Sequence, residues 1–203
     1  MKGKLITFEG SEGCGKSTQS RLLYEYLKNK GLPVVYLREP GGTELGEKIR
    51  SILLEPKNNI SPVCETLLYM AARAQIVDEI IKPELSKGRI VICDRFLDST
   101  IAYQGYGLGV DIGFIKNVGK SAAYGIKPDA TIFLDLPIKD GLKHRESTKD
   151  RIEKRSLQYH FRVRNGYLKL ASLEPKRIKI VKVDADKNKT QLKIREVMEK
   201  YVL

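Results

Sequence analysis

Residues 10–17 read Gly10-Ser11-Glu12-Gly13-Cys14-Gly15-Lys16-Ser17, which is a complete G-x-x-x-x-G-K-S phosphate-binding loop. An apolar run of strand length, residues 5–8, precedes the loop, and a segment with helical spacing of its apolar residues follows it. The motif therefore stands between a strand and a helix, as it requires. A glycine-rich turn that only caps a helix would not need a lysine and then a serine after its last glycine.

The loop predicts chemistry on a nucleoside triphosphate. Its glycines let backbone N–H groups turn inward around a polyphosphate, Lys16 brings positive charge to the outer phosphates, and Ser17 offers a hydroxyl ligand to Mg²⁺. We therefore expect a nucleoside triphosphate as the bound donor, with Mg²⁺. The predicted donor-binding residues are Gly10, Ser11, Glu12, Gly13, Cys14, Gly15, Lys16, Ser17 and Thr18.

The overall composition predicts one soluble domain spanning residues 1–203. A chain of 203 residues with 41% hydrophobic and 31% charged residues can bury a substantial core. No apolar run approaches the roughly 20 residues that cross a bilayer, and residues 1–4 lack an export signal, so we expect a cytoplasmic protein without membrane contact. The three scattered cysteines form no metal pattern and predict core or loop filling, although Cys14 beside Lys16 leaves an oxidation-sensitive thiol open.

The net charge of +12 admits two interpretations. Such a balance is typical of nucleic-acid-binding proteins, but an enzyme that brings two nucleotides together must also offset several negative charges. The basic residues are spread along the chain and form no basic arm with interleaved aromatic residues. We therefore expect small nucleotides, and no nucleic acid, as partners.

Alternating patterns predict an α/β fold with three layers. Short apolar runs alternate with longer stretches of helical spacing, which indicates a five-stranded parallel sheet with helices on both faces. The predicted strands cover residues 5–8, 34–37, 90–93, 131–134 and 178–183. The predicted helices cover residues 16–30, 43–54, 62–86, 96–104, 111–124, 138–145, 155–173 and 188–201.

One stretch, residues 144–155, is almost wholly polar and lies between the fourth strand unit and a later helix. Charge runs of this kind are usually exposed loops. Because phosphoryl transfer generally recruits arginines from a segment that can close, the phosphate-binding loop favours a lid over the phosphates at this place.

Several further motifs resemble those of thymidylate kinases. They run in order from about residue 4 to about residue 184, nearly the whole chain. The motifs are Phe8-Glu9-Gly10, Arg38-Glu39-Pro40-Gly41-Gly42-Thr43, Tyr69 with Arg73 on one helical turn, Ile92-Cys93-Asp94-Arg95-Phe96-Leu97-Asp98-Ser99-Thr100-Ile101-Ala102-Tyr103-Gln104-Gly105, Pro128-Asp129 and Asp150-Arg151-Ile152-Glu153.

The resemblance implies a P-loop nucleoside monophosphate kinase fold and transfer of the γ-phosphoryl group of ATP to dTMP, within dTTP synthesis, by a homodimer. It makes Lys16, Arg95 and Arg151 the catalytic residues, with Arg95 on the acceptor phosphate and Arg151 closing from the lid. No arginine stands at Glu12-Gly13 in the loop, so the chain is similar to the bacterial group that supplies this charge from the lid.

The resemblance also implies the remaining site residues. Tyr69 would stack on the pyrimidine, Arg73 would donate to a base carbonyl, and Tyr103 would reject a ribose 2′-hydroxyl. Acceptor-binding residues are implied at Glu12, Glu39, Arg50, Tyr69, Arg73, Arg95, Ser99, Thr100, Tyr103 and Gln104. Arg145 would stack on the donor base, beside the turn at Asp184-Ala185-Asp186.

Three points stay open at this stage. Asp94 either orients Arg95 or caps the next helix, or it makes a water-mediated link to Mg²⁺ together with Ser17. The family usually has Asp where Ala72 stands, which leaves the rigidity of Arg73 unsettled. Rival functions are a nucleic-acid motor ATPase, which predicts Asp-Glu where this chain has Asp94-Arg95, and a kinase for another nucleoside monophosphate.

Overall fold

The computed structural model describes residues 2–143 and 150–201. Its sheet has five parallel strands, as predicted, and their order is β2-β3-β1-β4-β5. All five predicted strand positions are confirmed. The strands are β1 (Lys4–Glu9), β2 (Val34–Arg38), β3 (Ile90–Asp94), β4 (Ala130–Asp135) and β5 (Ile178–Lys182).

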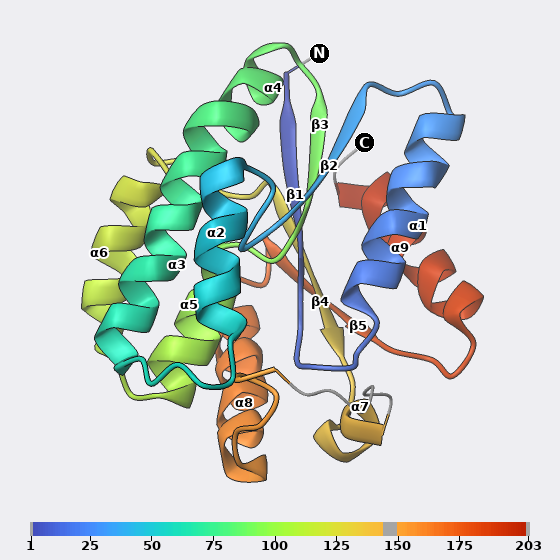
Figure 1. Cartoon of the computed structure of the whole chain (residues 1–203). Coiled ribbons are helices and arrows are strands. Elements are labelled where there is room, and N and C mark those ends of the chain that lie inside the picture. Colours follow the sequence, from blue (N-terminus) through green and yellow to red (C-terminus); the bar gives the residue numbers. More distant parts are fainter. Residues whose placement is uncertain (1, 144–149, 202–203) are drawn as a thin grey trace.

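Helices cover both faces of this sheet (Figure 1). On one face, α1 (Lys16–Asn29) and α9 (Lys187–Tyr201) pack on the sheet through buried residues such as Leu23, Leu27 and Met198. The other face is covered by the remaining long helices. These are α2 (Glu44–Leu54), α3 (Pro62–Ile76), α6 (Ile112–Ala122) and α8 (Leu157–Leu173). β3 is buried along its whole length between the two layers, which explains its continuous apolar sequence.

Side-chain caps fix where several helices begin. The Gly46 N–H donates to Thr43 Oγ1 at 3.0 Å, and the Phe114 N–H donates to Asp111 Oδ1 at 2.6 Å. Ser61 and Ser156 cap α3 and α8 in the same way. Each cap satisfies a backbone donor that the first helical turn leaves without a partner.

Two predicted helices contain wider turns than expected. The stretch predicted as one helix over 62–86 comprises α3, a π-helical turn η1 (Val77–Ile81) and α4 (Lys82–Ser86). Pro83 has no N–H to bond to the preceding turn, and the wider turn lies directly before its helix. The stretch predicted over 96–104 comprises α5 (Leu97–Thr100) and a π-helical segment, η2 (Ile101–Gly107), that runs three residues further.

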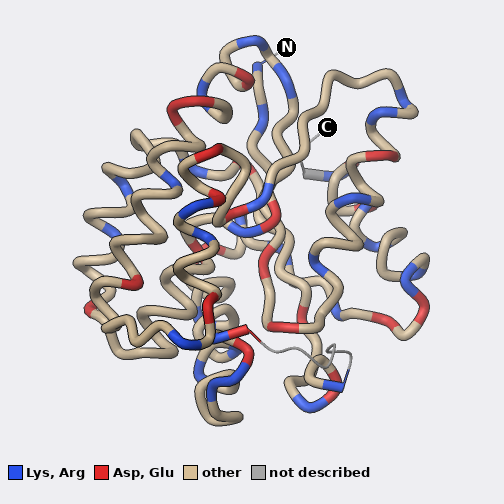
Figure 2. Tube along the Cα trace, viewed as in Figure 1, with Lys and Arg blue, Asp and Glu red and all other residues tan. Residues whose placement is uncertain are grey.

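Lysine and arginine residues are distributed over most elements of the chain (Figure 2). None of the helices within the described ranges is long and apolar enough to cross a membrane. The carboxyl ends of β1, β3 and β4 meet at one edge, where α7 (Ile138–Lys143) also lies. This edge places the phosphate-binding loop next to Asp94 and Arg95, as open α/β sheets generally do with their ligand sites.

Candidate active site

The phosphate-binding loop, residues 10–17, packs tightly against its neighbours. Gly13 has a φ of 73°, and a Cβ built there would lie 1.9 Å from the carbonyl oxygen of Gly141 in α7. Gly10 has a φ of 148°, and its Cβ would lie 2.7 Å from the carbonyl oxygen of Leu134. Only glycine fits these two positions, because both the backbone conformation and the space exclude a side chain.

Lys16 and Cys14 point inward from this loop. Lys16 is 7% exposed, and its Nζ donates to the Ser11 carbonyl oxygen at 2.9 Å, which holds the ammonium group over the loop. Burial raises the pKa of the Cys14 thiol, which is 1% exposed. The thiol is therefore protonated and shielded, and an oxidation-sensitive Cys14 is not supported.

Ser17 and Asp94 meet between α1 and the end of β3. The Ser17 hydroxyl donates to Asp94 Oδ2 at 2.5 Å, while Asp94 Oδ1 is buried and has no hydrogen-bond partner among the described residues. A buried carboxylate oxygen without a partner beside a serine hydroxyl suits a hard cation or the water molecules around it. No cluster of three acidic, histidine or cysteine side chains that could hold a metal ion exists in the described part of the chain.

Arg95, directly after β3, has a left-handed backbone with φ of 74°. Its Nη2 forms an ion pair with Glu12 Oε1 at 2.7 Å and donates to Tyr103 Oη at 3.0 Å. Burial opposes its charge, but the Tyr103 and Glu12 oxygens raise its pKa well above the ordinary value. Strained non-glycine backbone of this kind costs about 1–3 kcal/mol and occurs preferentially at functional sites.

Glu9 lies beneath Arg95 and holds the turn in which it stands. Glu9 Oε1 accepts from the Phe96 N–H at 2.8 Å, and Oε2 accepts from the Ser99 and Tyr167 hydroxyls at 2.5 and 2.8 Å. Burial, together with the charge of Asp98, raises the pKa of Glu9 to about 7. Sequence reasoning assigned no role to Glu9 or Tyr167, because their partners lie far away in the chain.

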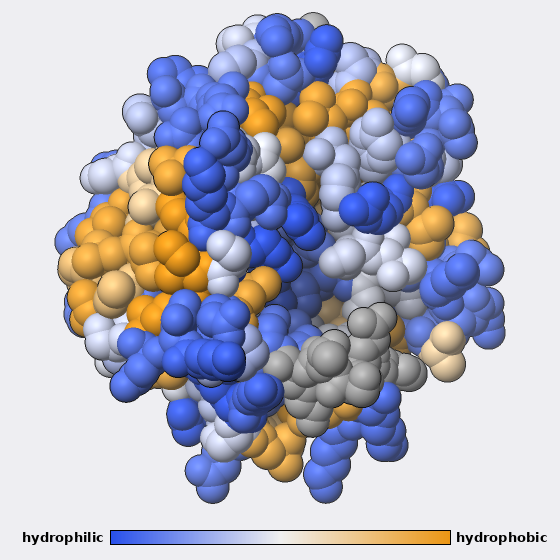
Figure 3. Space-filling model, viewed as in Figure 1, coloured by the Kyte–Doolittle hydropathy of each residue, from blue (hydrophilic) through white to orange (hydrophobic). Residues whose placement is uncertain are grey.

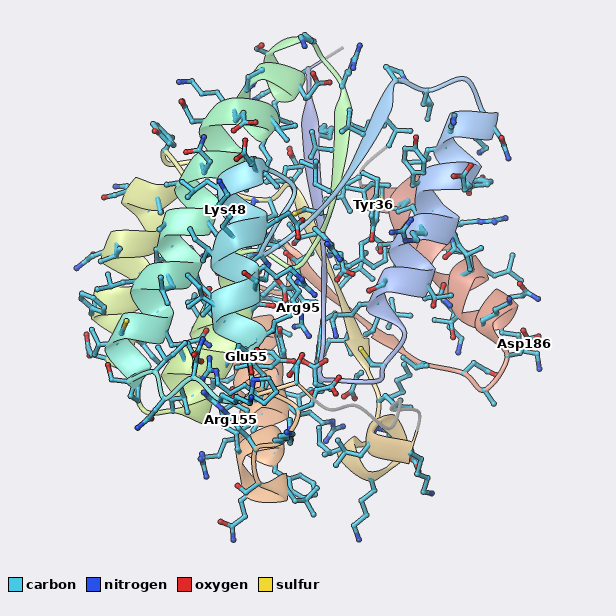
Figure 4. All side chains as sticks on the ribbon, viewed as in Figure 1. Tyr36, Lys48, Glu55, Arg95, Arg155 and Asp186 are labelled. Atoms are coloured by element: carbon cyan, nitrogen blue, oxygen red, sulfur yellow. The ribbon has the colours of Figure 1, made fainter. Side chains whose placement is uncertain are left out.

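A cavity opens on the side of Arg95 that faces α2 and α3. It brings together all ten residues predicted to bind the acceptor, and it adds Pro40, Leu54, Asp150 and Ile152, which sequence reasoning missed. Figure 3 shows a hollow with a hydrophilic lining in this part of the molecule. Arg95 lines the cavity, and Figure 4 shows it between α2 and the sheet. The ten predicted residues are Glu12, Glu39, Arg50, Tyr69, Arg73, Arg95, Ser99, Thr100, Tyr103 and Gln104.

A second cavity lies on the other side of the loop. Its lining includes residues 12–19 of the loop and of α1, together with Leu136, Lys143, Val183 and Thr190. Asp184 and Ala185 of the predicted base-side turn also line it. Glu12 lines both cavities, so they meet at this residue.

Comparisons with known proteins agree with this geometry. The family model for thymidylate kinase matches residues 8–194. The chain belongs to the thymidylate kinase family. A thymidylate kinase of Thermoanaerobacter sp. (strain X514) is 46% identical to this chain over 203 residues, and the match spans 100% of both proteins.

Two further relatives support the same assignment. A thymidylate kinase of Pelotomaculum thermopropionicum is 50% identical over 186 residues, which span 89% of this chain and 86% of the relative. The crystal structure of thymidylate kinase from Ehrlichia chaffeensis superposes with a TM-score of 0.81 at 37% identity, covering 97% of this chain and 98% of that one. The fold is therefore the P-loop nucleoside monophosphate kinase fold.

The departure from the thymidylate kinase pattern at Ala72 does not loosen Arg73. Arg73 is 1% exposed, and its Nε donates to Glu39 Oε2 at 2.8 Å while Nη1 donates to Thr100 Oγ1 at 3.1 Å. Ala72 instead packs with Ile49 and Leu53 in an apolar cluster. Glu39 thus holds Arg73 in place through this hydrogen bond. Burial raises the pKa of Glu39, and the Arg73 charge offsets part of that rise.

Of the two arginines predicted to act from the lid, one lies within the described residues and one does not. Arg145 falls outside the described residues. Arg151 is described: its Nε donates to the Leu53 carbonyl oxygen at 2.9 Å, and its Nη2 lies 2.6 Å from Glu65 Oε2. Arg151 therefore rests against α2 and α3, on the acceptor side of the site, and its role in closing over the phosphates stays a prediction.

Proposed function

We propose that this chain is an ATP-dependent dTMP kinase that converts dTMP and ATP to dTDP and ADP, a step of dTTP synthesis. The observation that carries the proposal is the meeting of two cavities at Glu12, one formed by the phosphate-binding loop and one lined by the predicted acceptor residues. Two nucleotides in these cavities would bring their phosphates together beside Arg95. Membership of the thymidylate kinase family supports the identity of both substrates.

The chemistry needs positioning and charge neutralisation more than a base. The acceptor phosphate is already an anion at neutral pH, so the protein must hold two anions in line and offset the charge on the transferred group. Lys16 and the loop amides would hold the donor phosphates. The Arg95 guanidinium would grip the acceptor phosphate after exchanging its contact with Glu12, and Arg151 would approach from the lid.

Magnesium fits the residues at the loop. The partnerless Oδ1 of Asp94 and the Ser17 hydroxyl would hold the ion directly or through water, with donor phosphate oxygens as the other ligands. When bound, the ion supplies positive charge to the donor phosphates. This assignment favours the metal-linked role of Asp94 over that of a helix cap, because its side chain makes no capping bond at the start of α5.

Nucleoside recognition follows from the cavity walls. Tyr69 and Arg73 stand one helical turn apart on α3 and line the cavity together, which supports stacking of a pyrimidine on the ring and donation to a base carbonyl. The Tyr103 hydroxyl donates to Glu12 Oε1 at 2.7 Å, which would hold the ring under the sugar and disfavour a 2′-hydroxyl. On the donor side, Leu136, Val183 and Ala185 offer apolar contact to adenine.

We also propose that the chain acts as a cytoplasmic homodimer through the helices on the acceptor side. Leu45 and Ile52 on α2 and Val63 and Leu67 on α3 are each 45–50% exposed. Figure 3 shows an apolar area on the flank where α3 and α6 lie. Light scattering after size exclusion tests this proposal, with a Leu67→Glu variant expected to give the monomer mass and wild type twice that mass.

The function is tested by measuring ATP turnover with the monophosphates of thymidine, uridine, cytidine, guanosine and adenosine, in deoxy and ribo forms. We expect the highest kcat/KM with dTMP. A higher value with any purine or ribose acceptor would replace this proposal by the kinase for another monophosphate. Turnover that needs nucleic acid and no monophosphate would favour the motor ATPase.

A further inference from the structure

Glu65 is a buried carboxylate that the predicted site does not include. It stands in the first turn of α3, one helical turn before Tyr69. Acidic residues in a first turn commonly face solvent and interact with the helix dipole. Glu65 instead is 0% exposed and faces the interior.

Two arginines and one glutamine from other parts of the chain surround the Glu65 carboxylate. Its Oε2 lies 2.6 Å from Nη2 of both Arg151 and Arg155, and its Oε1 accepts from Gln104 Nε2 at 2.8 Å. Figure 4 labels Arg155 on the side of the molecule where α2 ends near α8. Two cations therefore hold one oxygen of Glu65, and the other oxygen is presented to η2.

This arrangement decides which way the Gln104 amide points. A carboxylate that faces two guanidinium groups can only accept hydrogen bonds, so Gln104 must present its NH₂ group to Glu65. Gln104 also lines the acceptor cavity, with Arg73 and Thr100. We propose that Glu65 is a positioning residue that turns the carbonyl oxygen of Gln104 toward the acceptor base. This inference rests on the proposed function.

An oxygen at this position selects among pyrimidines. Thymine and uracil carry an N3–H donor between two carbonyl groups, whereas cytosine carries an N3 acceptor next to an amino donor. Gln104 Oε1 and the Arg73 guanidinium line the same cavity, and together they would match the donor and acceptor order of thymine. With cytosine, the amide oxygen would meet the N3 lone pair and the guanidinium would meet the amino group, which leaves buried polar groups unpaired.

The variant Glu65→Gln tests the proposal because it should reverse the Gln104 amide. The two arginines would draw the oxygen of residue 65 toward themselves, so its NH₂ would face Gln104 and turn the NH₂ of Gln104 to the cavity. We expect the ratio of kcat/KM for dTMP over dCMP to fall by about tenfold or more. The ratio for dTMP over dUMP should stay within about twofold, since both bases carry N3–H.

Two control variants separate positioning from structural support. Arg155→Met removes one cation but keeps the Glu65 contact with Gln104, so the dTMP over dCMP ratio should not change, whatever happens to kcat. The reciprocal exchange, Glu65→Gln with Gln104→Glu, again presents an oxygen to the cavity and should restore that ratio to within about threefold of wild type. This exchange keeps the number of charges, and it decides the case if Glu65→Gln alone does not fold.

The outcomes distinguish this inference from the proposed function. Equal losses of kcat/KM for dTMP, dUMP and dCMP in Glu65→Gln would show that Glu65 only supports the structure. The same conclusion would follow if the double variant Glu65→Gln with Gln104→Glu folds but does not recover the dTMP over dCMP ratio. If the wild-type chain phosphorylates none of the three monophosphates, the proposed function itself fails.

Discussion

Glu12 Oε1 and Arg95 Nη2 lie 2.7 Å apart, so a carboxylate of the loop that faces the donor cavity neutralises the arginine that faces the acceptor cavity. Tyr103 donates to the same carboxylate oxygen and keeps the pair in place. A phosphate that enters beside Arg95 must replace this carboxylate as its partner. Because the ion pair already holds the guanidinium in position, less conformational entropy is lost when the acceptor phosphate binds.

Arg95→Ala should reduce kcat/KM for dTMP by a factor that corresponds to at least about 3 kcal/mol, because it removes a preorganised charge from the acceptor phosphate. Steady-state kinetics with ATP in excess measure the loss. Arg89→Ala is the matched control: it also breaks an arginine–glutamate pair of 2.7 Å, but at the opposite end of β3. Similar kinetics for both variants would remove Arg95 from the mechanism.

Lys16→Ala should lower turnover at least about a hundredfold while the fold is kept, since the Lys16 ammonium group hydrogen-bonds to two loop residues, Ser11 and Cys14, and to no other described residue. Coupled ADP release and a thermal melt measure the two properties on the same sample. Lys28→Ala, on an exposed position of α1, should leave turnover unchanged. Normal turnover in the Lys16 variant would discredit the donor side of the site.

The buried pair of Arg73 and Glu39 predicts a non-additive stability effect. Arg73→Ala should lower the free energy of unfolding by about 3–5 kcal/mol, because Glu39 stays buried without its partner. The double variant with Glu39→Ala should lose less than Arg73→Ala alone, as urea denaturation would show. Lys48→Ala, which breaks an exposed pair on α2 (Figure 4), should cost less than about 0.5 kcal/mol. Additive losses at residues 39 and 73 would contradict the pairing.

Glu9 predicts a loss of stability as the pH rises. Its pKa in the folded protein is about 7, raised from 4.5 by burial and by Asp98. Between these two values the folded protein keeps a proton that the unfolded chain releases, so the contribution of Glu9 is present in full below pH 4.5 and is lost as the pH passes through 7. Urea denaturation from pH 5 to pH 8 should therefore show a smaller decline for Glu9→Gln than for wild type. Parallel curves for the two proteins would refute this role.

The sheet was predictable because its signals are local: apolar runs of strand length mark β1 to β5. The acceptor cavity was predictable only through the resemblance of the motifs around Tyr69 and Arg95 to those of thymidylate kinases. Glu65 gave no such signal, because a glutamate in a first helical turn is ordinary and its partners lie at residues 104, 151 and 155. For the same reason the hydrogen bond from Arg73 to Glu39 could not be predicted. The Glu39 carboxylate takes the place of the carboxylate that the family usually has at position 72.

The contact between Gly13 and Gly141 has a consequence for engineering. A Cβ at Gly13 would meet the Gly141 carbonyl oxygen, and a Cβ at Gly141 would meet the Glu12 carbonyl oxygen at 2.4 Å, so the nucleotide loop and the short helix before the lid form one sterically matched unit. A chimaera that imports a lid from another kinase should therefore be cut after α7, so that the native pair of glycines is transplanted or retained as a whole.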